Sequence, residues 1–275
     1  EIIQKLIKIK KIKDLKVISI VNLNGQTPNL KLLSQLSKKY KFYIIEDACH
    51  ALGAYYKIKN RRFAIGSCKH SDISTFSFHP VKSITTGEGG AVTTNNKIFY
   101  NKIKILRSHG IIRNPNKYFE YDIKKLSNNY RISDINCALG ISQILKIDKI
   151  IIKRRKLYNI YCKKLETLKN FINIPKINNL LSAHHLMLVS FKNFTFKKKV
   201  KLIHYLNKNK IYPQFHYIPL YKFKVVKDNN DGIFGKYGSE KFYSSFLSLP
   251  LFYNLKISSI DKVVKLLKTY LTRPL

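Results

Sequence analysis

A strand, a helix and a second strand follow one another near the start of the chain, and this order constrains the fold more than any other feature. Residues 17–23 (VISIVNL) form a short β-branched run closed by Asn24-Gly25. Residues 30–40 then show helical spacing of apolar positions, and residues 42–48 (FYIIEDA) are predominantly apolar rather than alternating. An unbroken apolar run fits a strand of a parallel sheet that is covered on both faces. We therefore predict an α/β fold with a mostly parallel sheet.

Two further strands are expected on either side of a turn-rich segment. Residues 73–78 (ISTFSF) and 91–95 (AVTTN) have strand character, and HPVKSITTGEGG lies between them. In open α/β sheets, ligands collect beyond the carboxyl ends of the strands. Because Asp47 and the loop that contains Lys82 both follow such ends, we expect these two side chains to converge.

The second half of the sequence predicts a smaller α/β domain. A helix-compatible stretch runs from a capping residue at Ser133 to about Leu168 and would link the two parts. Beyond it we expect strands at 184–191 and 212–221, and helices at 196–210 and 257–271. We place the large domain at residues 1–150 and the linking helix with the small domain at 151–275. A basic stretch around Asn60, Arg61 and Arg62 is interpreted as a loop.

Composition removes several other classes of protein. The formal net charge of +37 would suit a polyanion partner, but the lysines are spread over nearly every segment, whereas a nucleic-acid-binding surface would concentrate them. The four cysteines are scattered without a CxxC pair, so we expect free thiols and no metal site. No long uncharged apolar run and no secretory signal are recognisable, so we expect a cytoplasmic protein with no membrane contact.

A lysine in a turn after a buried strand, with a carboxylate at the end of a neighbouring strand, matches what pyridoxal-phosphate chemistry requires. The lysine would carry the cofactor, and the carboxylate would keep the pyridine nitrogen protonated. Taken singly, a loop lysine is more often a solvated surface residue, and an aspartate at a strand end is often a cap. The residues by themselves leave these readings open.

Longer sequence segments narrow the choice among these interpretations. The chain contains IIEDACHALGAYY, GSCKHSDISTFSFHPVKSITTGEGGAVTTN, RSHG, NNYRISDINCALGISQIL and QFHYIPLY, in this order. This series resembles the DegT/DnrJ/EryC1/StrS family of nucleotide-sugar aminotransferases, from about Val17 to the C-terminus. The resemblance implies the type I fold of pyridoxal-phosphate aminotransferases, with glutamate as amino donor. Within the family, the strings are most similar to the branch that aminates C4 of a UDP-linked 4-keto-6-deoxy sugar in pseudaminic acid biosynthesis.

The resemblance also implies roles for individual residues. Lys82 matches the lysine that binds the cofactor covalently, Asp47 the partner of the pyridine nitrogen, and His50 the residue beside the phenolic oxygen of the ring. Ser77 matches a serine that binds the cofactor phosphate. Asn129 matches an asparagine that reaches the cofactor phosphate of a neighbouring subunit, which implies a homodimer with shared active sites. Residues that could face the substrate, or be structural, are His79, His109, His216 and Tyr217.

Relative to the family, the first hundred or so residues are missing, and with them several strands of the large domain. The chain is therefore expected to contain only part of that domain. Two alternatives remain beside an active transaminase. One is a basic nucleic-acid-binding protein, or an inactive fragment, in which the catalytic strings are relics. The other is a sugar dehydratase on the same scaffold, against which the presence of Lys82 argues.

Overall fold

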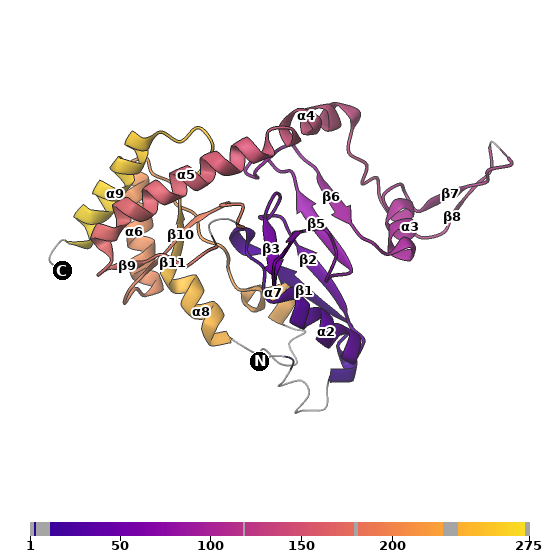
Figure 1. Ribbon diagram of the computed structural model, residues 1–275, viewed down its shortest axis with the longest axis horizontal. Coiled ribbons are helices and arrows are strands. Elements are labelled where there is room, and N and C mark those ends of the chain that lie inside the picture. Colours follow the sequence, from indigo (N-terminus) through magenta and orange to yellow (C-terminus); the bar gives the residue numbers. More distant parts are fainter. Residues whose placement is uncertain (1–2, 4–11, 118, 179–180, 228–235, 273–275) are drawn as a thin grey trace. The chain divides into compact units, whose positions relative to one another are not determined.

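The computed structural model describes residues 3, 12–117, 119–178, 181–227 and 236–272 (Figure 1). These residues fall into two compact units. Of the described residues, 12–117, 119–151 and 181–183 belong to the N-terminal unit, and 3, 152–178, 184–227 and 236–272 belong to the C-terminal unit. Each unit has its own sheet, and we describe each by itself.

The N-terminal unit is built on a four-stranded sheet with the strand order β1-β2-β5-β6. The strands are β1 (Val17–Val21), β2 (Tyr43–Asp47), β5 (Ile73–Ser77) and β6 (Gly90–Thr93). β1 pairs in parallel with β2, and β2 in parallel with β5, whereas β6 runs antiparallel to β5. This confirms the predicted strand-helix-strand unit and the mostly parallel character of the sheet.

Two helices flank β2. Helix α2 (Leu30–Tyr40) begins at Asn29, whose side chain accepts a hydrogen bond from the backbone N–H of Leu32, and it ends at Lys41, which has a left-handed φ of 58°. Helix α3 (Lys97–Leu106) contributes Phe99, whose ring meets the Tyr43 ring edge-on at 5.3 Å. Ile44 is buried, but Tyr43 is 52% exposed. Only one face of β2 is therefore fully covered here, in contrast to the two covered faces predicted.

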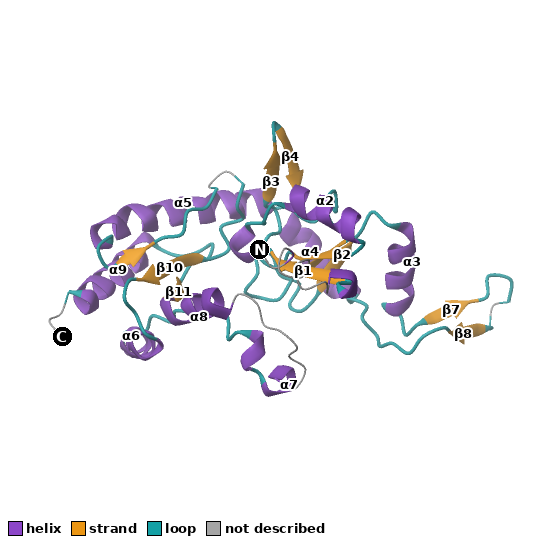
Figure 2. Ribbon diagram, turned by 90° about the horizontal axis from the view of Figure 1, so that it is seen from below, coloured by secondary structure: helices purple, strands orange, loops and turns teal. Residues whose placement is uncertain are grey.

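Two hairpins also belong to this unit. Strands β3 (Tyr55–Ile58) and β4 (Arg61–Ala64) pair antiparallel, so the interpretation of the region around Asn60, Arg61 and Arg62 as a loop is wrong for the two arginines. The Arg62 guanidinium lies 4.2 Å from the centroid of the Tyr55 ring, and this contact stabilises the pair. The second hairpin pairs β7 (Ile111–Arg113) with β8 (Tyr121–Ile123). It projects beyond α3 in Figure 2.

The predicted linking helix is two helices. Helix α4 (Asp134–Ile144) begins at the predicted cap, because the Ser133 hydroxyl accepts a hydrogen bond from the backbone N–H of Asn136. Helix α5 (Ile147–Leu165) follows after a break at residues 145–146. Apolar spacing continues through the break, so periodicity alone does not reveal it.

The C-terminal unit contains an antiparallel sheet in the order β11-β10-β9, and helices pack on it. Its remaining elements are β9 (Ile172–Asn173), β10 (Met187–Phe191), α6 (Phe196–Lys208), α7 (Lys224–Lys227), α8 (Lys236–Ser245), β11 (Phe246–Leu249) and α9 (Ile257–Leu271). The core joins Leu157 and Tyr161 of α5 with Leu202 of α6, Val263 of α9 and Val189 of β10. α6 and α9 confirm the two helices predicted for this part.

Two strand predictions for the C-terminal unit are wrong or too long. Residues 212–221 form no strand: Gln214 makes an isolated bridge with Ser248 of β11, and the segment ends in a 3-10 helix at Leu220–Lys222. Pro213 and Pro219 lack the N–H that an extended ladder needs. The strand expected at 184–191 begins only at Met187.

Lys199 of α6 is fully buried and surrounded by aromatic rings. Its Nζ lies 4.5 Å from the ring centroid of Tyr243, 5.1 Å from that of Phe215 and 5.3 Å from that of Phe196. The same ammonium donates a hydrogen bond to the Tyr243 carbonyl. Burial lowers the pKa of Lys199 to about 8, because a charged amine loses its hydration there.

This burial predicts a pH dependence of stability. Below pH 8 the ammonium is charged in both the folded and the unfolded state, and the full cost of burying it is present. Between about 8 and the ordinary value of 10.5 the unfolded chain binds more protons, so the free energy of unfolding rises with pH. We expect a rise of about 1–2 kcal/mol over this window that is absent in Lys199→Met. Urea unfolding of both proteins at four pH values measures it, and a pH-independent difference between them would contradict this origin.

Candidate active site

The carboxyl ends of β2 and β5 meet at one edge of the N-terminal sheet. Asp47 is the last residue of β2 and lies in register with Thr75 of β5. Ser77, the last residue of β5, pairs with Gly90 at the start of β6. The loop 78–89, which contains Lys82, therefore leaves and re-enters the sheet at the edge where Asp47 ends β2. Parallel pairing produces this meeting, because it aligns strand ends that are far apart in the sequence.

Asp47 and Lys82 both act on Cys49. The backbone N–H of Cys49 donates a hydrogen bond to Oδ1 of Asp47 at 3.1 Å. Burial, hydrogen bonding to Asp47 and the negative charge of Asp47 together raise the pKa of the Cys49 thiol to about 11, and the positive charge of Lys82 acts in the opposite direction. The charges of the carboxylate and the amine thus both influence the pKa of one thiol. Because that thiol is protonated at neutral pH, Cys49 is not a nucleophile there.

Backbone hydrogen bonds hold the Lys82 loop closed at its base. Phe78 donates to the Gly89 carbonyl at 2.9 Å, and Thr86 donates to the Phe78 carbonyl at 3.0 Å. A Cβ on Gly90 would lie 2.5 Å from the carbonyl oxygen of Phe76, so only glycine fits where the loop rejoins the sheet. Lys82 itself is half-buried, and its N–H donates to the His79 carbonyl at 2.9 Å. The lysine is therefore held in a defined turn.

His50, Ser77 and His79 flank these two residues. His50 is buried, with 7% of its surface exposed, and follows Cys49 in the turn after β2. The Ser77 hydroxyl accepts a hydrogen bond from the His79 N–H at 3.4 Å. His79 lies on the same loop as Lys82, and its Nε2 is 3.7 Å from a carboxylate oxygen of Glu88. An amine, a carboxylate, an imidazole and a hydroxyl are thus available at one sheet edge.

Asn129 and His109 lie together on a different segment. Asn129 forms an antiparallel bridge with Ser108, and the His109 N–H donates to the Asn128 carbonyl at 3.1 Å. Both side chains are exposed. The Asn129 side-chain oxygen accepts a hydrogen bond from the Arg131 N–H at 3.1 Å, which fixes its orientation.

His216 and Tyr217 belong to the C-terminal unit. Nε2 of His216 lies 2.7 Å from the Ser248 hydroxyl of β11, and the His216 and Tyr217 rings are 4.8 Å apart. Tyr217 is 58% exposed. Ser248 therefore holds the segment 212–221 against β11, although the two form no β-ladder.

The donor set at the β2 and β5 ends fits pyridoxal phosphate. The cofactor needs an amine for covalent attachment, a carboxylate for its pyridine nitrogen, and donors for its phenolic oxygen and phosphate. Lys82, Asp47, His50 and Ser77 have these chemistries. The sequence did not predict that Cys49 belongs to this group. A lone cysteine gives no such indication until the fold shows that Lys82 influences its thiol.

The described residues lack two kinds of feature. Within these ranges, no three His, Cys, Asp or Glu side chains gather as a metal site would require. Likewise, none of the helices of the described chain is long and apolar enough to cross a membrane.

Comparison with known proteins places these observations in context. The model of the DegT/DnrJ/EryC1/StrS aminotransferase family matches residues 1–268. A UDP-4-amino-4,6-dideoxy-N-acetyl-beta-L-altrosamine transaminase of Campylobacter jejuni is 40% identical over 88% of this chain. A protein of the same name from Helicobacter pylori is 32% identical over 93% of it. The chain spans 62% of the length of the first and 66% of the second.

Solved structures give the same picture. The Helicobacter pylori aminotransferase involved in the biosynthesis of pseudoaminic acid superposes with a TM-score of 0.82 at 30% identity, covering 93% of this chain and 67% of that one. A putative sugar aminotransferase of Streptococcus pneumoniae, solved with the pyridoxamine form of the cofactor, has the same TM-score at 24% identity, covering 96% of this chain and 71% of that chain. The predicted fold class is confirmed.

Proposed function

Because the chain belongs to the DegT/DnrJ/EryC1/StrS aminotransferase family, we propose that it acts as a pyridoxal-phosphate-dependent transaminase on a nucleotide-linked keto sugar. Glutamate would be the amino donor. The observation that carries the proposal is that Asp47 ends β2 at the sheet edge where the loop containing Lys82 leaves β5 and returns to β6.

The residues of this chain would divide the work as follows. Pyridoxal phosphate, when bound, supplies an electron sink for the bond that is broken at the substrate carbon. Asp47 would keep the pyridine nitrogen protonated, His50 would lie beside the phenolic oxygen, and Ser77 would bind the phosphate. Lys82 would hold the cofactor covalently and, once displaced, would move a proton at the substrate carbon.

For the substrate, we propose C4 of a UDP-linked 4-keto-6-deoxy-N-acetylhexosamine. The names of the Campylobacter and Helicobacter relatives support this choice. His79 and His109 of the N-terminal unit, and His216 and Tyr217 of the C-terminal unit, are the side chains we propose for contact with the sugar nucleotide. The proposal retains the cytoplasmic location expected from the sequence.

We further propose a homodimer in which Asn129 serves the active site of the neighbouring subunit. Exposed apolar side chains in the segment before Asn129 and at the two ends of α4 support an interface, since Leu126 is 96% exposed, Ile135 84% and Leu145 81%. Light scattering on the purified chain measures the molar mass, and a monomer at all concentrations would exclude shared sites.

Binding of nucleic acid is the less supported alternative. It rests on the net charge of +37 alone, which is spread along the chain. The relatives named above are transaminases.

The test of the proposal is direct product detection. The chain is incubated with pyridoxal phosphate, glutamate and a panel of UDP- and dTDP-linked keto sugars, and amino sugars are identified by mass spectrometry. Formation of an amino sugar that requires both glutamate and the cofactor supports the proposal. Cofactor bound at Lys82 without any amino sugar would show that the substrate class is wrong.

Asp47→Asn tests the role of the carboxylate. An amide cannot hold the pyridine nitrogen protonated, so we expect transamination to fall by about a hundredfold or more while the cofactor still attaches to Lys82. The matched control is Asp148→Asn, which makes the same change at an exposed position in the first turn of α5. Rates of the glutamate half-reaction measure both, and equal rates in the two variants would remove Asp47 from the mechanism.

A further inference from the structure

One charged side chain of β2 lies among buried apolar neighbours. Glu46 is 1% exposed, and because successive residues of a strand point to opposite faces, it faces away from the side on which Asp47 lies. Ile44 of β2 and Ala48 just beyond the strand are both buried, and Ile20 of β1 lies in register with Glu46. A buried carboxylate costs free energy that an apolar side chain at the same position would not. Its hydrogen-bond partners therefore decide what it contributes.

Two neutral donors bind the Glu46 carboxylate. Nδ2 of Asn22 donates to Oε2 at 2.9 Å, and the Ser71 hydroxyl donates to Oε1. Asn22 follows the end of β1 and is fully buried, whereas Ser71 lies two residues before β5 begins. Within the described ranges, no ion pair involves Glu46. Hydrogen bonds from two separate segments thus hold the carboxylate, without a counter-charge.

Asn22 connects Glu46 to Asp47. The side chain of Asn22 donates to Glu46, and its backbone N–H donates to the Asp47 carbonyl at 2.9 Å. Two adjacent residues of β2 therefore hold one residue beyond the end of β1. The Oδ1 atom of Asn22 has no hydrogen-bond partner in the part of the chain that the structure describes. There, the bond to Glu46 is what orients the Asn22 side chain.

The β5 side of Asp47 is held separately. The backbone N–H of Ala48 donates to the Thr75 carbonyl at 2.8 Å, and Oδ1 of Asp47 accepts from the Cys49 N–H. The carbonyl of Asp47, on the β1 side, depends on Asn22 instead. A displacement of about 1 Å in a reacting group can cost about a hundredfold in rate. Loss of the Asn22 contact would therefore be felt at Asp47.

We propose that Glu46 is a positioning residue for Asp47. By orienting Asn22, it fixes the end of β2 from which the Asp47 carboxylate would meet the pyridine nitrogen of the cofactor. The inference rests on the proposed function and adds to it a side chain on the opposite face of the sheet. Because both donors to Glu46 are neutral groups, the role depends on its acceptor oxygens, and an amide can replace the carboxylate.

Glu46→Leu and Glu46→Gln separate the acceptor from the charge. Leucine is similar in size but has no acceptor, whereas glutamine keeps one for Asn22, and the Ser71 hydroxyl can turn to accept from its amide. Absorption titrations measure the dissociation constant of pyridoxal phosphate, and stopped-flow mixing measures the glutamate half-reaction. We expect Glu46→Leu to weaken cofactor binding by about tenfold and to slow the half-reaction by about a hundredfold. Glu46→Gln should stay within about threefold of the unaltered chain in both.

Ser71→Ala is the matched control, because it removes a hydrogen bond to the same carboxylate but leaves the bond from Asn22. It should keep cofactor affinity within about threefold of the unaltered chain. If circular dichroism shows that Glu46→Leu does not fold, Asn22→Ala replaces it, with the same expected losses. Losses in Ser71→Ala as large as those in Glu46→Leu would mean that Glu46 only stabilises the unit, and would overturn the inference.

Coupling to Asp47 gives the readout that a merely structural role would not change. If Glu46 acts through Asp47, adding Glu46→Leu to Asp47→Asn should slow the half-reaction by no more than about threefold beyond Asp47→Asn alone. Full additivity of the two losses would contradict this. Cofactor bound at Lys82 with the same affinity in Glu46→Leu as in the unaltered chain rejects the role of Glu46 only. No cofactor at Lys82 in the unaltered chain rejects the transaminase, and this role with it.

Discussion

Replacing Lys82 with alanine is expected to remove the borohydride-stable link between the chain and pyridoxal phosphate, and to lower transamination by about a thousandfold or more. Lys82 is half-buried in a turn that the Phe78 and Gly89 backbones hold closed, and its positive charge lowers the pKa of Cys49, which the charge of Asp47 raises. No other residue type at this edge can both attach the cofactor and move the proton, so the loss should affect both readouts.

The labelling must be mapped, because 44 of the 52 basic residues are lysines and each can react to some extent. Peptide mass spectrometry after reduction locates the adduct at limiting cofactor. Lys97→Ala serves as the control, since Lys97 begins α3 and is exposed. The control should keep the Lys82 adduct and full activity. Adducts spread over surface lysines in the unaltered chain would show that its residues do not form a cofactor site.

Local patterns predicted the part of the fold that carries this site. Residues 30–40 form a helix with the predicted bounds, because Asn29 caps its start and a left-handed residue at 41 ends it. The strands before and after the Lys82 loop were also predicted, since each is a short apolar run next to turn residues. From parallel strand ends alone, Asp47 and Lys82 were expected to converge, and both act on Cys49.

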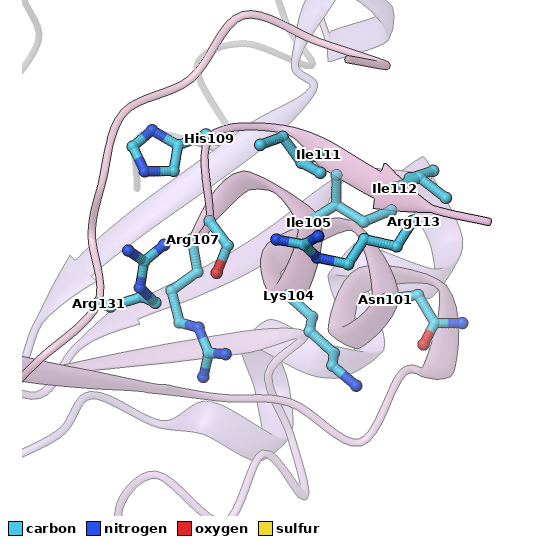
Figure 3. Close-up of a pocket in the computed structure, with 10 residues that line it drawn as sticks. Asn101, Lys104, Ile105, Arg107, His109, Ile111, Ile112, Arg113 and Arg131 are labelled. Atoms are coloured by element: carbon cyan, nitrogen blue, oxygen red, sulfur yellow. The ribbon is translucent and has the colours of Figure 1, made fainter. Parts of the chain in front are cut away.

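The features that were missed depend on contacts between distant segments. Residues 212–221 were expected to form a strand, but among the described residues of this segment only Gln214 forms a β-bridge, with Ser248. The break between α4 and α5 occurs within continuous helical spacing. The pocket lined by Arg107, Arg113 and Arg131 (Figure 3) joins the end of α3, β7 and the segment after Asn129, and the sequence indicates it only through three rare arginines between positions 107 and 131. Periodicity describes one segment at a time, so it cannot report such pairings.

Replacing Arg154 of α5 is expected to cause the largest loss of stability. Its guanidinium is buried and donates to three backbone carbonyls, those of His184 at 2.9 Å, His185 at 2.6 Å and Leu251 at 2.9 Å. Burial lowers its pKa to about 10, and the side chain still remains charged at neutral pH. One side chain thus holds two chain segments against the helix.

Arg154→Ala is expected to lower the free energy of unfolding by about 3–5 kcal/mol, because it leaves three buried carbonyls without donors and opens a cavity. Arg154→Lys should recover less than half of this, since a single ammonium cannot reach three acceptors in the geometry of the fork. Lys153→Ala, on the exposed side of the same helix, is the control and should change stability by less than about 0.5 kcal/mol. Urea unfolding followed by circular dichroism gives all three values. Equal free energies of unfolding for Arg154→Ala and Lys153→Ala would contradict this expectation. The carbonyls of His184, His185 and Leu251 would then be hydrogen-bonded to water, and the Arg154 guanidinium would not be the group that joins these segments to α5.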